Sequence, residues 1–121
     1  MANKQLKVEM ADTPSLREQG LMFRNKLEDN SGMIFKFNHP QNLKFWGLNT
    51  FIPLSIAFVS QDNKIISIEQ ISPFSLKCVE SSTNCSIAIE ANHDFFDKNN
   101  IGVGSSIDVV KDGINNYVIF K

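Results

Sequence analysis

Short runs in which apolar and polar residues alternate recur along the chain, and this pattern predicts a protein made mostly of β-strands. Leu6, Val8 and Met10 alternate with charged residues, as in a strand with one buried face. The run from Leu54 to Val59 is mostly apolar, which is typical of a strand buried on both faces. Further strands are expected over residues 33–37, 43–50, 65–71, 74–79, 86–91, 107–110 and 117–120.

Two short segments have the signals of helices. Thr13 is a favoured N-cap residue, and Pro14 is favoured at the first helical position. Gly20 is a favoured stop, so we expect a helix from Pro14 to Gln19. A second helical turn, capped by Asp94, is expected over residues 94–99.

Most expected strands are joined by short turn sequences, at residues 38–42, 61–63 and 112–113. Short connections favour antiparallel neighbours. We therefore expect a mainly β (β-dominated α+β) fold, with a small, twisted, barrel-like antiparallel or mixed sheet of about eight strands and one or two short helices. Barrel closure would remove the exposed sheet edges. The length of 121 residues fits a single domain over residues 1–121.

Composition narrows the function classes. The net charge is −1 and the basic residues form no run, which argues against binding to nucleic acid. No apolar run reaches the roughly 20 residues of a membrane span. No signal peptide is visible, so we expect a cytoplasmic protein, or an exported one if a leader was removed. Ten of the twelve aromatic residues are Phe, and we expect most of these rings in the core.

The cysteines and histidines give no strong case for a metal or a disulfide. Cys78 and Cys85 could bridge across a hairpin loop, but free thiols in a reducing compartment are the favoured interpretation. His39 lies in an expected turn, and His93 is followed by the expected cap. These residues are too few for a metal site, and no cofactor is expected.

Several segments, in this order and at these distances, resemble the family known as domain of unknown function 192. They are Gly20–Arg24, Gly32–Phe35, Phe45-Trp46 with Asn49-Thr50, Ile52–Leu54, Pro73, Ile89-Glu90 and Gly102–Gly104. The resemblance runs from about residue 9 to residue 109. It implies a small, twisted, barrel-like β fold and no established activity.

The chain departs from the family pattern at several positions. Gly47 and Leu48 stand where the family usually has Met and Lys, and Ser55 and Ser105 stand where it usually has Asp. His93-Asp94 replaces a small residue and Gly. Chemistry that used the lost Lys and Asp side chains is therefore expected to be absent or altered here.

Trp46, Asn49 and Thr50 are candidate ligand-binding residues. Trp46 could serve as a stacking platform while Asn49 and Thr50 orient a ligand, because binding pockets are mostly apolar with a few convergent polar groups. In the alternative, Trp46 packs in the core, and Asn49 and Thr50 bond to the backbone at a bulge before Pro53.

Arg24 and Glu90 are the charged candidates. A buried Glu needs a partner, so the two could form a structural ion pair. In the alternative, Arg24 binds an anion, or Glu90 is a general base, in a cleft.

The sequence favours a non-catalytic small β-barrel module that binds a small molecule or a partner protein. It has no Gly-x-Ser-x-Gly elbow and no phosphate-binding loop. The alternatives are an enzyme of unknown class that uses Glu90 and Arg24 in a cleft, or an accessory structural protein.

Overall fold

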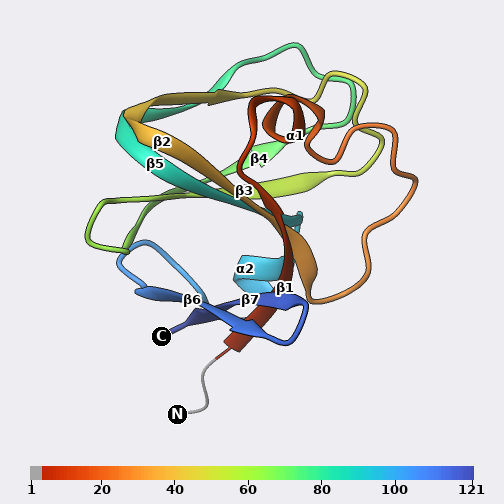
Figure 1. Cartoon of the computed structure of the whole chain (residues 1–121). Helices are drawn as coiled ribbons and strands as arrows, with labels where there is room; N and C mark the ends of the chain where they lie inside the picture. The colour runs from red at the N-terminus through yellow and green to blue at the C-terminus, as the bar shows by residue number, and fades with distance from the viewer. Residues whose placement is uncertain (1–3) are drawn as a thin grey trace.

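A curled, mixed, seven-stranded sheet forms most of the structure, a computed structural model that describes residues 4–121 (Figure 1). The strands are β1 (Lys4–Ala11), β2 (Ser31–Phe45), β3 (Leu54–Val59), β4 (Ile65–Ile71), β5 (Val79–Asn92), β6 (Ile107–Asp112) and β7 (Asn115–Phe120). Their order across the sheet is β4-β3-β5-β2-β1-β7-β6. The expected mainly β, barrel-like fold with two short helices is confirmed.

The curl brings the two edge strands together at one end. Lys64, just before β4, and Ser106, just before β6, form an isolated β-bridge. The Ile65 amide donates to the Ser105 carbonyl over 2.9 Å, and the Ile107 amide donates to the Asn63 carbonyl over 2.9 Å. Closure is limited to this end, so the sheet is a half-barrel. Elsewhere β4 and β6 remain its two edge strands.

One connection differs from the expected short turns. β1 and β2 are parallel neighbours, whereas every other pair in the sheet is antiparallel. Parallel strands need a long crossover. Residues 12–30 provide it, and they carry the first helix over one face of the sheet (Figure 1).

Two long strands replace three expected short ones, and the expected strand over 74–79 is wrong except at Val79, where β5 begins. β2 runs through the expected turn at residues 38–42, and β5 runs through the segment between the cysteines. The register between them shifts from Lys36 to Gln41 and again from Asn42 to Lys44. The predicted turn is therefore wrong, because its residues are absorbed as a β-bulge. β2 ends at Phe45, so the expected strand over 43–50 is also wrong beyond that residue.

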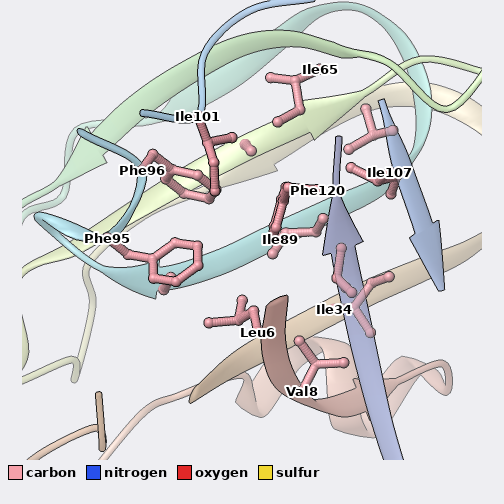
Figure 2. Packing of buried hydrophobic residues seen from close by; sticks show 14 residues of the cluster. Leu6, Val8, Ile34, Ile65, Ile89, Phe95, Phe96, Ile101, Ile107 and Phe120 are labelled. Carbon is pink, nitrogen blue, oxygen red and sulfur yellow. The ribbon is translucent and has the colours of Figure 1, made fainter. Parts of the chain in front are cut away.

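Each face of the sheet carries its own hydrophobic cluster. The inner cluster includes Ile34, Ile89 and Phe120, and Figure 2 shows how these side chains converge. The outer cluster includes Phe35 and Phe58. Neighbouring residues such as Ile34 and Phe35 point to opposite faces because strand side chains alternate. β3 is buried at every position, as the sequence predicts.

The helix α2 (Phe95–Lys98) covers the inner cluster. Phe95 and Phe96 are buried, and their ring centroids lie 5.8 and 5.9 Å from that of Phe120. Asp94 occupies the N-cap position, but its side chain makes no capping hydrogen bond. The predicted burial is confirmed, whereas the predicted side-chain cap is wrong.

The helix α1 (Pro14–Gln19) has the predicted bounds and lies over the outer face of the sheet (Figure 1). The Thr13 hydroxyl accepts a hydrogen bond from the Leu16 amide over 3.2 Å. Gly20 follows the helix with φ of 49°, in the left-handed region that favours glycine. A strong cap matters here, because none of the α1 residues is fully buried.

We expect Thr13→Ala to lower the free energy of unfolding by about 1 kcal/mol, because one amide of α1 loses its acceptor. Urea denaturation measures the change. Ser15→Ala is the control, because Ser15 is an exposed helical residue with no side-chain hydrogen bond within residues 4–121. Equal stability of the Thr13 variant and the wild-type protein would contradict the capping role.

Candidate functional site

A pocket of about 390 Å³ lies on the outer face, between α1 and β2; we call it the α1–β2 pocket. α1 and the turn after it form one wall. Phe35, Phe37 and Phe45 of β2 supply aromatic surface, and Trp46, Leu48 and Thr50 form the remaining wall. The volume falls within the usual range of small-molecule sites.

Glu90 is a buried lining residue of the α1–β2 pocket. It lies on β5, opposite Met33 of β2 and Ile56 of β3, and is only 5% exposed. Within residues 4–121 its carboxyl group makes no hydrogen bond or ion pair. Desolvation raises its pKa from 4.5 to about 8, so the group is mostly protonated at neutral pH.

Two cationic side chains, Arg17 and Lys44, line the more open part of the pocket. Arg17 donates to the Lys36 carbonyl over 2.8 Å, and its guanidinium carbon lies 4.8 Å from the centroid of the Phe37 ring. This cation–π contact holds the guanidinium group against β2.

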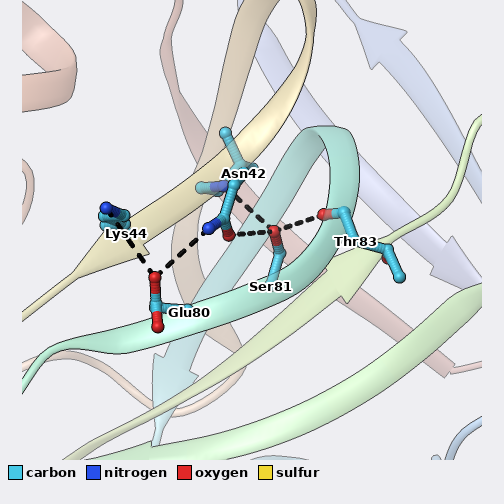
Figure 3. Close-up of polar contacts among 6 residues, drawn as sticks. Asn42, Lys44, Glu80, Ser81 and Thr83 are labelled. Carbon is cyan, nitrogen blue, oxygen red and sulfur yellow. Dashed lines mark hydrogen bonds and ion pairs between the residues drawn. The ribbon is translucent and has the colours of Figure 1, made fainter.

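Lys44 lies beside a polar network that joins β2 and β5. Its ammonium group lies 3.8 Å from Glu80, and Glu80 accepts a hydrogen bond from the Asn42 side chain over 3.2 Å (Figure 3). The buried Ser81 hydroxyl accepts from the Leu43 amide over 2.9 Å and donates to the Thr83 carbonyl. These bonds tie β2 to β5 where their register shifts.

Residues 46–50 form a fixed loop rather than a strand. The Gly47 amide donates to the Ser75 carbonyl over 2.9 Å, and the Phe74 amide donates to the Thr50 carbonyl over 3.2 Å. A Cβ atom on Gly47 would lie 2.1 Å from the Ser72 carbonyl oxygen. The loop is therefore packed against residues 72–75, and this contact requires glycine at position 47.

The loop gives its candidate residues different surroundings. Trp46 is 51% exposed and lines the pocket. Thr50 is buried, lines the pocket and donates to the Leu48 carbonyl over 3.2 Å. Asn49 lies outside the pocket lining, in a left-handed conformation with φ of 56°. The interpretation of Trp46 as a core residue is therefore wrong.

Arg24 is also outside the α1–β2 pocket. It forms a bidentate ion pair with Glu9 of β1, with one contact of 2.7 Å, beside a second cavity of about 330 Å³. The guanidinium group lowers the pKa of Glu9. The predicted ion pair between Arg24 and Glu90 is therefore wrong, because the parallel β1 strand brings Glu9 to this loop instead.

We expect Arg24→Gln to lower the free energy of unfolding by less than about 1 kcal/mol, because its ion pair is partly exposed. A double-mutant cycle with Glu9→Gln, followed by urea denaturation, measures the coupling between the two side chains. The coupling should shrink as pH falls through the lowered pKa of Glu9. A coupling of several kcal/mol would contradict a peripheral role.

The cysteines and the possible metal ligands form no second reactive site in the described part of the chain. Cys78 is exposed and Cys85 buried, both are free thiols, and burial raises the pKa of Cys85. Over residues 4–121, no three His, Cys, Asp or Glu side chains are grouped to hold a metal ion. Neither helix described here has the length and apolar character to cross a membrane.

Most phenylalanine rings are buried or half-buried, as expected, and three are exposed. Phe23, Phe51 and Phe74 are 63%, 40% and 62% exposed. The Phe51 centroid lies 6.4 Å from that of Phe23 and 5.3 Å from that of Phe74. The three rings lie outside the pocket lining. Their residues adjoin the loop 46–50, because the Phe23 and Phe74 amides donate to the Asn49 and Thr50 carbonyls.

Most of the pocket lining could not be predicted from the sequence. Arg17, Phe37, Lys44 and Phe45 were not recognised as lining residues. Arg17 belongs to a correctly predicted helix, but no local signal says which face of the sheet that helix covers. The pairing of β2 with β5, which brings Glu90 close to these residues, depends on long-range register.

The comparisons with known proteins agree with the fold. A protein from Sinorhizobium meliloti 1021, whose name proposes a role as a transcription regulator, has a TM-score of 0.79 and 26% identity. The match covers 96% of this chain and 92% of that one. A protein of unknown function from Novosphingobium aromaticivorans DSM 12444 has a TM-score of 0.82 and 32% identity, covering 85% of this chain and 74% of that one.

Sequence comparison gives the family. No curated protein matches the chain. The family model for domain of unknown function 192, described as an uncharacterized ACR, matches residues 1–109, a range that includes all of the sequence motifs. The chain therefore belongs to the family known as domain of unknown function 192.

Proposed function

We propose that this protein binds a small organic molecule in the α1–β2 pocket. The single observation that carries the proposal is Glu90, a buried carboxyl group that lines the pocket and has no protein partner among residues 4–121. Four aromatic side chains and two cationic ones line the same space. Such a combination of apolar surface and a few polar groups is typical of ligand sites.

Among the four buried polar or charged residues of the described chain, Glu90 differs in having no hydrogen-bond partner, although the hydroxyl of the half-buried Ser67 also has none. Thr50 donates to a carbonyl, Ser55 accepts from Gln70 over 2.8 Å, and Ser81 accepts from the Leu43 amide. A buried polar group without a partner destabilises the fold and calls for an explanation. A ligand that bonds to Glu90 supplies one.

Fluorescence of Trp46 tests the proposal, because Trp46 is the single tryptophan of the chain and lines the pocket. Its exposure predicts a red-shifted emission maximum. We expect at least one member of a panel of small amines, carboxylates, sugars and nucleosides to change this emission. In the ¹H–¹⁵N NMR spectrum the same compound should shift amides of α1, β2 and residues 46–50.

Two alanine variants make the test specific. Phe37→Ala removes a ring of the pocket wall and should weaken binding about tenfold. Ile114→Ala removes an exposed apolar side chain between β6 and β7, outside the lining, and should leave the affinity unchanged. Shifts that cluster elsewhere, or no response to any compound, would overturn the proposal.

Catalysis by Glu90 is a second candidate function. The supporting observation is its pKa of about 8, in the range useful for proton transfer near neutral pH, in a pocket that a substrate could enter. Arg24, the other residue in the expected enzyme site, lies outside this pocket. NMR spectra of each bound compound over hours distinguish the two functions, because turnover produces new resonances and simple binding does not.

A further inference from the structure

We propose that the ligand of the α1–β2 pocket is a small zwitterion, with an ammonium group that pairs with Glu90 and an anionic group that pairs with Arg17 and Lys44. This inference depends on the proposed binding function and specifies its ligand class. It follows from three features of the pocket: its buried acid, its aromatic surface and its cationic side chains.

The buried acid favours an ammonium group. Glu90 offers two carboxyl oxygens, and no donor among residues 4–121 uses either of them. An ammonium group carries three donors and a positive charge, so it can satisfy both the hydrogen bonding and the charge of the ionised carboxylate. A neutral ligand would bond to the protonated carboxyl group, whereas an ammonium group would pair with its ionised form.

The aromatic surface also favours a cation. The Phe35 and Phe45 rings meet at 77° with centroids 4.9 Å apart, and the Phe37 centroid lies 6.5 Å from that of Phe45. Trp46 completes the set of rings in the lining. Aromatic faces attract cations, and they also stack on a planar ligand.

The cationic side chains favour an anionic group at the other end of the ligand. Arg17 and Lys44 come from α1 and β2, on two sides of the pocket. Arg17 is held by the Lys36 carbonyl through one nitrogen, which leaves other guanidinium donors for a ligand. Glu18 in the lining and Glu80 beside Lys44 balance part of this positive charge. A zwitterion complements both the remaining positive charge and Glu90.

Binding of an ammonium group changes the protonation of Glu90. The free carboxyl group is mostly protonated at neutral pH, and pairing with a cation favours its ionised form. The proton leaves to solvent, so about one proton should be released per ligand bound. The other charged groups of the pocket lining are Arg17 and Glu18 of α1 and Lys44 of β2.

Titration calorimetry with four matched probes tests this inference: para-aminomethylbenzoate, benzylamine, benzoate and benzyl alcohol. We expect the zwitterion to bind most tightly, benzylamine next, and benzoate and benzyl alcohol weakest. Glu90→Gln should weaken the two ammonium compounds at least about tenfold and leave benzyl alcohol unchanged. Buffers with different ionisation enthalpies should show proton release for the ammonium compounds in the wild-type protein only.

The outcomes separate this inference from the proposed function. If benzoate or benzyl alcohol binds in the pocket more tightly than benzylamine, as judged by amide shifts, the zwitterion is overturned and the binding function stands. If the ammonium compounds bind to the Glu90→Gln variant as tightly as to the wild-type protein, the assigned role of Glu90 is overturned. If none of the four probes shifts pocket amides at millimolar concentration, and the wider panel also fails, both proposals are overturned.

Discussion

Glu90→Gln should stabilise the protein at alkaline pH, by roughly 3–5 kcal/mol at about pH 9. The folded-state pKa of about 8 lies above the unfolded value of 4.5, so folding disfavours the ionised carboxylate. The wild-type protein should carry no such penalty below 4.5, lose stability as pH rises towards 8, and lose no more above it. Gln is neutral throughout and avoids this loss.

Urea denaturation at about pH 5 and about pH 9 measures this effect. The variant and the wild-type protein should differ little at the lower pH and strongly at the higher one. Glu69→Gln is the matched control, because Glu69 is an exposed carboxylate on β4 and its removal should leave the pH dependence unchanged. Wild-type stability that does not fall between these pH values would contradict the burial of an unpartnered Glu90.

Gly47→Ala should lower the free energy of unfolding by about 2–3 kcal/mol and weaken binding in the α1–β2 pocket. The added Cβ would meet the Ser72 carbonyl oxygen at 2.1 Å, and that oxygen belongs to backbone that cannot rotate away. Residues 46–50 must therefore shift, and the shift moves Trp46 and Thr50 in the pocket wall.

Gly102→Ala is the matched control for this substitution. A Cβ at Gly102 would meet nothing within 4 Å, so the same chemical change should leave stability and binding unchanged. Urea denaturation gives the stability difference. A change in the Trp46 emission spectrum would show that the pocket wall has moved. A Gly47 variant with wild-type stability and emission would contradict the close packing of this loop against residues 72–75.

Local signals were sufficient for the elements that depend on local chemistry. The cap and stop residues Thr13 and Gly20 bound α1 as predicted. The Asp112-Gly113 turn joins β6 and β7, and the apolar run from Leu54 to Val59 is a buried strand. In each case a few neighbouring residues determine the conformation, so no knowledge of the rest of the fold is needed.

Local signals failed where the partner strand decides the conformation. Asn38–Asn42 has the composition of a turn, yet Gln41 and Asn42 pair with β5, and the residues between Lys36 and Gln41 form an irregularity within β2. The parallel pairing of β1 with β2 was likewise not expected. It depends on a crossover whose path over the sheet is fixed by packing rather than by turn sequences.

The candidate site was predicted in part. Trp46, Thr50 and Glu90 come together in one pocket lining, whereas Arg24 and Asn49 lie outside it. The family motifs drew attention to all five residues without saying which of them meet. Glu90 reaches the pocket through the pairing of β5 with β2 and β3, which is long-range information that no motif contains.

The central claim is that Glu90 has no protein partner among residues 4–121 and pairs with the ammonium group of a ligand. The most direct test is a ¹³C NMR titration of the Glu90 carboxyl carbon, with and without para-aminomethylbenzoate. We predict a pKa of about 8 in the free protein and a clearly lower value with the zwitterion bound, because pairing with an ammonium group favours the carboxylate. A carboxyl carbon that titrates near 4.5 in the free protein, or whose pKa does not change with the probe present, would contradict the account.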